Sequence, residues 1–208
     1  MHVQSLNPTI AAGLGQSHDS QQRWLKNYYF IRALVSALWV AVALVVGTKN
    51  PMVAGALLLI YPAWDAAANW LDARKSGGLK TNLTQRVNVG VSAVATLGVA
   101  VALTSGMNAV IAVIGVWAVA AGLLQLSTAV RRWKSQGAQW AMVLSGAQSA
   151  LAGGFFVAQS LMVTPPSIAN IAGYAGVGAI YFLISAVWLT VKQMQLGAKP
   201  PSVAARTD

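Results

Sequence analysis

The sequence predicts an all-helical integral membrane protein, with six transmembrane helices arranged as three tandem antiparallel hairpins. Three observations lead to this fold class. The 208 residues are 56% hydrophobic and only 9% charged, which is too little polar surface to cover a soluble globule of this size. Six apolar stretches are each long enough, at about 20 residues, to cross about 30 Å of hydrocarbon. Basic residues collect in every second segment that flanks or joins these stretches.

The apolar stretches divide the chain into three regions. Residues 1–27 are polar, lack a hydrophobic period and predict a flexible cytoplasmic N-terminal arm. Residues 28–191 form the six-span transmembrane domain, and residues 192–208 form a flexible cytoplasmic C-terminal tail. The first apolar run begins late and has no convincing cleavage site, so we expect it to remain as a span. The expected spans are Tyr28–Val46, Pro51–Asp72, Val87–Ser105, Met107–Val130, Gln139–Val163 and Ile168–Val191.

Short turns predict the hairpins. Residues 47–50 join the first two spans, residues 105–106 join the third and fourth, and residues 164–167 join the fifth and sixth. Because loops this short hold consecutive helices side by side, each pair is expected to form an antiparallel hairpin.

An internal repeat supports the tandem plan. A shift of sixty residues aligns the ends of the even-numbered spans, and the odd-numbered spans repeat more loosely around a serine. Glycine after a basic helix end is also a common cap, so the aligned glycines alone do not require a repeat. The aligned residues are Asp65, Gln125 and Ser185; Gly77, Gly137 and Gly197; and, in the odd spans, Val35-Ser36-Ala37, Val91-Ser92-Ala93 and Gln148-Ser149-Ala150.

The basic residues predict the orientation. Twelve of the fourteen Lys and Arg residues lie at the two termini and in the connections 73–86 and 131–138. The other side has only Lys49, and Arg32 lies within the first span. The positive-inside rule therefore places both termini in the cytoplasm. Because the net charge of +10 is divided among spaced loops and is not gathered on one water-facing surface, it does not indicate nucleic-acid binding.

Asp65 is the most chemically specific residue of the spans. It lies about 10 Å inward from Asp72 at the rise of a helix, and a carboxylate at that depth needs a partner or water. Arg32, about 6 Å into the first span, has a side chain long enough to reach it. Gln85, Arg86 and Asn88 are alternative partners. The candidate intramembrane polar cluster consists of Arg32, Asp65, Asn69, Arg86 and Gln125.

Two interpretations of this cluster remain open. In the first, Asp65 holds adjacent helices together through a charge-assisted hydrogen bond. In the second, the polar stripe around Asp65 serves a small transporter or an ion-conducting protein. A proton relay normally needs several titrating groups, and the chain has no Glu, no His in any span and no second deep carboxylate. The structural interpretation is therefore favoured.

No enzyme site, cofactor or metal centre is indicated. The chain has no cysteine, His2 and His18 both lie in the N-terminal arm, and the Asp residues lack metal-ligand spacing. The lipid bilayer is the expected partner. Two rows of small residues in the fifth span allow close helix approach, either within one chain, which is favoured, or in self-association. The rows are Ser145, Ser149 and Gly153, and Gly146, Ala150 and Gly154.

Several motifs occur in a characteristic order. They are Asn50-Pro51, the small residues from Gly115-Val116-Trp117 to Gly122, the basic end Arg131-Arg132-Trp133, and Trp-x-x-x-Leu-x-Gly from Trp140 to Gly146. This order resembles the short membrane repeat of the HdeD-like acid-resistance family over about residues 25–195. The sequence departs from that pattern at Pro62, which replaces a mid-span glycine, and in lacking a proline between the third and fourth spans.

The resemblance implies a multi-pass protein of the bacterial inner membrane. It implies a structural or interaction role linked to acid-stress tolerance, and it carries no catalytic residues to this chain.

Overall fold

The computed structural model describes residues 8–75, 77–132 and 139–197, and these residues fold into helices without any strand. The prediction of an all-helical chain is confirmed. In hydrocarbon every backbone N–H and C=O must be paired internally, which favours helices throughout. The elements are α1 (Pro8–Val42), the π-helical turn η1 (Ala43–Gly47), α2 (Pro51–Lys75), α3 (Leu83–Ala102), α4 (Met107–Arg132), α5 (Gln139–Gln159) and α6 (Ile168–Gly197).

Five segments of the described chain are long and apolar enough to cross a membrane, which supports a multi-pass membrane protein. The remaining long helix, α5, has 21 residues and ends at Gln159, before the expected end at Val163. The five segments are Arg23–Gly47, Pro51–Lys75, Leu83–Ala102, Met107–Ser127 and Ile168–Gln195.

Both terminal helices extend beyond the expected spans. The N-terminal arm was expected to lack regular structure, but residues 8–27 continue α1, which begins at Pro8. Proline is favoured at a first helical position, and a helix already nucleated in the first span extends into the preceding residues without forming a new nucleus. Likewise α6 runs past Val191 to Gly197. Residues 1–7 of the arm, 198–208 of the tail and 133–138 of the second basic connection lie outside the described residues.

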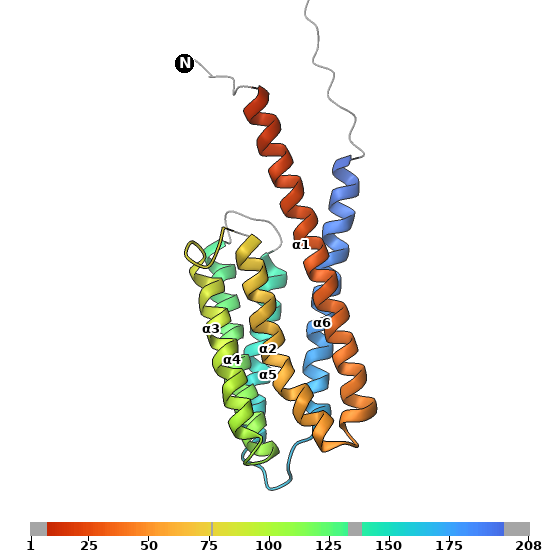
Figure 1. Cartoon of the computed structure of the whole chain (residues 1–208), viewed down its shortest axis with the longest axis vertical. Coiled ribbons are helices and arrows are strands. Elements are labelled where there is room, and N and C mark those ends of the chain that lie inside the picture. The colour runs from red at the N-terminus through yellow and green to blue at the C-terminus, as the bar shows by residue number, and fades with distance from the viewer. Residues whose placement is uncertain (1–7, 76, 133–138, 198–208) are drawn as a thin grey trace, which may run out of the picture.

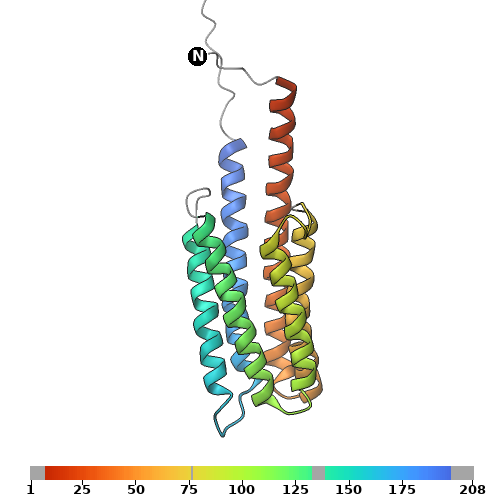
Figure 2. The same cartoon turned by 90° about the vertical axis from the view of Figure 1, so that its left-hand side faces the viewer.

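The closest helix pairs differ from the predicted hairpins. In Figures 1 and 2, α1 lies beside α6 along much of its length, while α2 pairs with α3 and α4 pairs with α5. The α3–α4 contact joins these last two pairs, whereas α1 with α2, and α5 with α6, touch over only a small area. Short turns bring helix ends together, but the side chains along each helix decide which faces meet.

Glycines explain why α4 pairs with α5. Gly115 lies against Gly153 and Gly122 lies against Gly146, so the two backbones are in direct contact. A Cβ atom added to Gly122 would lie 2.5 Å from the carbonyl oxygen of Gly146, closer than any side chain can sit. Such small residues allow membrane helices to gain van der Waals contact along their backbones. Part of both predicted small-residue rows of the fifth span is therefore used within the chain, while Gly154 faces open space.

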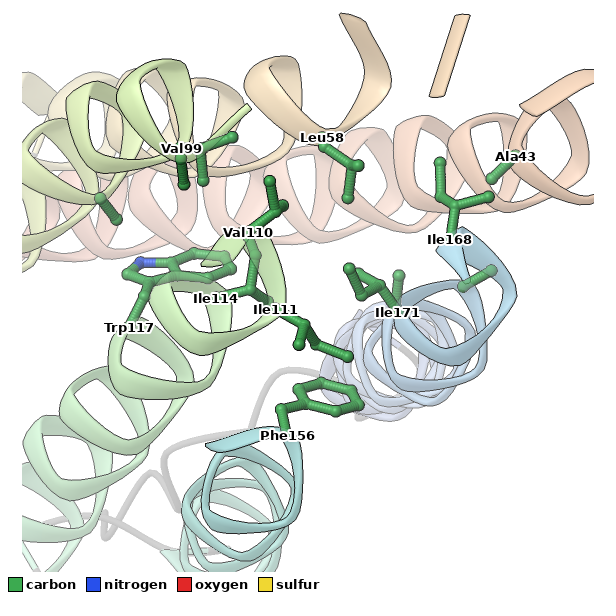
Figure 3. Close-up of a cluster of buried hydrophobic side chains, with 14 of the residues drawn as sticks. Ala43, Leu58, Val99, Val110, Ile111, Ile114, Trp117, Phe156, Ile168 and Ile171 are labelled. Atoms are coloured by element: carbon green, nitrogen blue, oxygen red, sulfur yellow. The ribbon is translucent and has the colours of Figure 1, made fainter. Parts of the chain in front are cut away.

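An apolar cluster lies in the interior toward the end that holds the turns 48–50 and 103–106 (Figure 3), where its members Leu58, Val110 and Ile168 also line a pocket of about 400 Å³. Pro62 lies next to this cluster and cannot donate a backbone hydrogen bond within α2. Beside it, Trp39 Nε1 donates to the carbonyl oxygen of Leu57 at 2.8 Å, one residue before the Leu58 carbonyl that loses its usual donor at Pro62, and α2 continues unbroken. The fully buried members with the largest side chains are Leu58, Val99, Val110, Ile111, Ile114 and Ile171.

Candidate functional site: an intramembrane polar centre

Arg32 of α1 and Asp65 of α2 form an ion pair inside the bundle. Arg32 Nη2 donates to Asp65 Oδ1, and the two side chains are only 12% and 17% exposed. Both residues lie in helical segments that are apolar enough to span a membrane. Burying either charge alone would be costly, so each residue supplies the compensation that the other requires.

Two further side chains donate to the Asp65 carboxylate. Asn69 Nδ2 donates to Oδ2 at 2.8 Å from one turn further along α2, and Ser92 Oγ of α3 donates to the same oxygen at 2.8 Å. Ser92 Oγ in turn accepts a hydrogen bond from Trp117 Nε1 of α4 at 3.0 Å. The carboxylate is therefore the centre of a hydrogen-bonded network that links α1, α2, α3 and α4, and its charge-assisted bonds are the strongest kind available.

Aromatic rings enclose the guanidinium group. Arg32 Nη1 donates to Tyr28 Oη at 3.0 Å. The Phe182 ring of α6 covers the same group, with Arg32 Cζ 4.3 Å from the ring centroid. A cation over an aromatic face at this distance is attracted by the ring quadrupole. The α1–α6 pair therefore contributes to the polar centre as well as to the outer wall of the bundle.

A polar cavity of about 130 Å³ lies beside the ion pair. Side chains from α1, α2, α4, α5 and α6 line it, and Arg32 and Asp65 form part of its wall. Among the described residues, the side-chain amides of Gln125 and Gln148 have no hydrogen-bond partner. The other polar lining residues include Ser36, Ser145, Ser149, Tyr174 and Tyr181.

The five residues of the predicted cluster separate into three groups. Arg32, Asp65 and Asn69 are brought together by direct bonds. Gln125 lines the adjoining cavity. Arg86 is exposed, and no hydrogen bond or ion pair among the described residues joins its side chain to the polar centre. At that end of the bundle its neighbour Gln85 turns inward instead and donates through Nε2 to Asp72 Oδ2.

Sequence reasoning missed several members of the centre, although one pattern pointed to them. The serines of the odd-numbered repeat, Ser36, Ser92 and Ser149, are all buried in the bundle. Ser92 bonds Asp65, and Ser149 bonds both the carbonyl oxygen of Ala118 and the hydroxyl of Tyr174. The recurrence of one polar residue at matching depth in three apolar spans was the available signal. No comparable pattern marks Trp117 or Phe182.

Within the described residues, no group of three or more His, Cys, Asp or Glu side chains could hold a metal ion. Comparisons of the whole chain with protein-family models, curated proteins and solved structures found no match. The class that the fold and the site define is therefore a multi-pass helical membrane protein with a hydrogen-bonded polar centre inside its bundle.

Proposed function

We propose that this chain is a six-span protein of the bacterial inner membrane with both termini in the cytoplasm. The alternating directions of the helices (Figure 1) and the concentration of twelve basic residues at the two termini and in the connections 73–86 and 131–138 of the sequence support this threading. Reporter fusions at Lys49 and Lys80 test it. We expect the two positions to report opposite compartments, and a shared compartment would contradict the threading.

We propose further that the chain has a structural or interaction role in that membrane, in which the polar centre fixes how the helices meet. The observation that carries this proposal is the set of donors on Asp65: Arg32, Asn69 and Ser92 all donate to one carboxylate. Breaking these bonds would leave a buried carboxylate without its donors, which is energetically costly. The carboxylate therefore serves as a permanent link between helices.

A double-mutant cycle tests the structural role. Asp65→Asn and Arg32→Gln each leave the other partner buried without its counter-charge, and each is expected to cost about 3–5 kcal/mol of unfolding free energy. The double variant is expected to lose clearly less than the sum of the two. The measurement is unfolding in mixed micelles, with exposed Arg86→Gln as the control. Strictly additive losses would mean that Arg32 and Asp65 are not energetically coupled, which would contradict the structural role of the pair.

The physiological setting that we propose is tolerance of acid stress, supported by the motif order shared with the HdeD-like family. Survival at low pH of cells lacking this chain, with and without complementation, tests it. We expect complementation by the unmodified chain to restore survival. Equal survival of all strains would remove this part of the proposal.

Self-association through the fifth span is the interaction that we propose. The outer face of α5 supports it, because Leu144, Leu151 and Phe155 are all at least half exposed and lie on one side of the helix. Cross-linking between cysteines introduced at Leu151 in two copies tests this contact. Cross-linking no more frequent there than at a lipid-facing position of α3, such as Leu97, would contradict it.

Transport of a small solute or ion is the second candidate function, and the polar cavity is the observation that favours it. The apolar cluster lies between this cavity and the turn end, so passage would require that cluster to part. Flux into proteoliposomes is the direct test. Flux that is unchanged by Asp65→Asn would exclude this residue from the mechanism.

A further inference from the structure

The cavity beside Arg32 and Asp65 is small enough to limit what it can hold. Its volume is about 130 Å³. A water molecule occupies about 30 Å³ in the liquid, so the space suits about four waters or one solute of comparable size.

The charges around the cavity favour a neutral occupant. Arg32 and Asp65 are the formally charged residues of the lining, and they pair with each other. Asn69 and Ser92 add further donors to the carboxylate. An ionic solute would therefore bring an uncompensated charge into a protein interior surrounded by hydrocarbon, which is strongly unfavourable.

The lining contains two carboxamides without a described partner, in addition to the unpaired N–H donors Arg32 Nε and Trp64 Nε1. Gln125 comes from α4 and Gln148 from α5, and each amide offers both donor and acceptor positions that no described residue satisfies. Ser145, one turn from Gln148, adds a hydroxyl to the same wall. A carboxamide or a urea group matches such a wall, because it too presents a carbonyl acceptor next to N–H donors.

The helices that carry these two amides are held at a fixed separation. The backbone contacts of Gly122 with Gly146 and of Gly115 with Gly153 leave no space for α4 and α5 to come closer. Gln125 and Gln148 lie within one turn of the first of these contacts. A site on such a rigid support is arranged before its ligand arrives, which lowers the entropic cost of binding.

We propose that this cavity is a binding site for a small neutral solute of the carboxamide or urea type, held between the side-chain amides of Gln125 and Gln148. The inference goes beyond the structural role proposed above. It concerns binding alone, so it stands whether or not the solute crosses the membrane.

Side-chain NMR of the full chain in lipid nanodiscs tests the site, with the glutamine amides labelled by ¹⁵N and acetamide as the probe. We expect a saturable shift of the Gln125 and Gln148 side-chain resonances, each assigned by its disappearance in Gln125→Leu or Gln148→Leu. Gln159 lies on α5 outside the cavity lining and is the internal control, expected not to shift. Equal shifts of all three, or no shift of Gln125 and Gln148, would overturn the proposal.

Charge selectivity and one variant complete the experiment. Acetate and methylammonium, close in size to acetamide, are expected not to bind, and acetate binding as tightly as acetamide would overturn the neutral class. Gln125→Leu should weaken acetamide binding, followed at Gln148, about fivefold, equivalent to one neutral hydrogen bond, whereas Gln159→Leu should not change it. Unchanged affinity in Gln125→Leu also contradicts the site. Should that variant fail to fold, selectivity among the three probes in the unmodified chain decides the question.

Discussion

The two halves of the bundle interior are built differently. Near the short turns, the helices enclose an apolar cluster of Leu, Ile, Val and aromatic side chains. Toward the basic ends, the same helices enclose an ion pair, several hydroxyls and a polar cavity. Since lipid tails are as apolar as leucine, the apolar half gains stability from close contact and not from leaving water. The polar half gains less from contact and more from bonds that only one arrangement of helices satisfies.

The comparison predicts that truncating a buried side chain in the apolar half costs more than removing a neutral hydrogen bond in the polar half. Leu58 is fully buried in the apolar half, so Leu58→Ala should leave a cavity and cost about 2–5 kcal/mol of unfolding free energy. Unfolding in mixed micelles measures it. Leu97→Ala on α3 is the matched control, because Leu97 is 69% exposed and faces outward. Similar losses for the two variants would mean that the apolar cluster is not tightly packed.

The α4–α5 contact spans both halves, and it should be sensitive to one added methyl group. Gly122→Ala places a Cβ against the Gly146 backbone and should cost about 1–3 kcal/mol as the helices separate. Gly154→Ala, which meets open space on the same helix pair, should be neutral or slightly stabilising. Thermal unfolding of the two variants compares them directly, and an undisturbed Gly122→Ala protein would contradict backbone contact at this point.

Within the polar half, the buried Ser92 is expected to contribute more to stability than the buried Ser36. Ser92→Ala removes one donor from Asp65 and leaves the buried Trp117 N–H without its acceptor, for a loss of about 1–3 kcal/mol. Ser36→Ala removes a hydroxyl that lines the cavity and is expected to cost less. If the two serine variants lose stability equally, the network around Asp65 is not the ordering element of this half.

The smallest effect is expected at Arg86, the exposed member of the predicted cluster. Arg86 is exposed, so Arg86→Gln should leave the Tm unchanged, whereas Arg32→Gln should lower it clearly. A marked decrease of the Tm in Arg86→Gln would mean that the polar centre includes the start of α3.

Depth along a helix could be read from the sequence, and contact between helices could not. The pairing of Arg32 with Asp65 could be predicted from the sequence, because the rise per residue places both at similar depths in neighbouring spans. Which faces meet depends on shape around the helix axis, and the glycine contacts of α4 with α5 appear only when both helices are seen together. For the same reason turn length suggested that α1 would lie along α2, although α6 is its main neighbour.

The N-terminal segment shows a second limit. Residues 8–27 have no hydrophobic period, and a periodicity argument gives them no reason to be helical. Their helix extends from a span that is already formed, so its cause lies outside the segment itself. The polar cavity was likewise beyond reach, because Gln125 and Gln148 come together only through the contact of their two helices.

The pairing of α1 with α6 has a consequence for biogenesis. During synthesis the first helix enters the bilayer long before the last one is made, so it must wait without its main neighbour. Asp65 arrives with the very next helix and can neutralise Arg32 at once, whereas the Phe182 ring can cover that cation only at the end. The ion pair is thus suited to retain α1 at its correct depth until α6 completes the bundle.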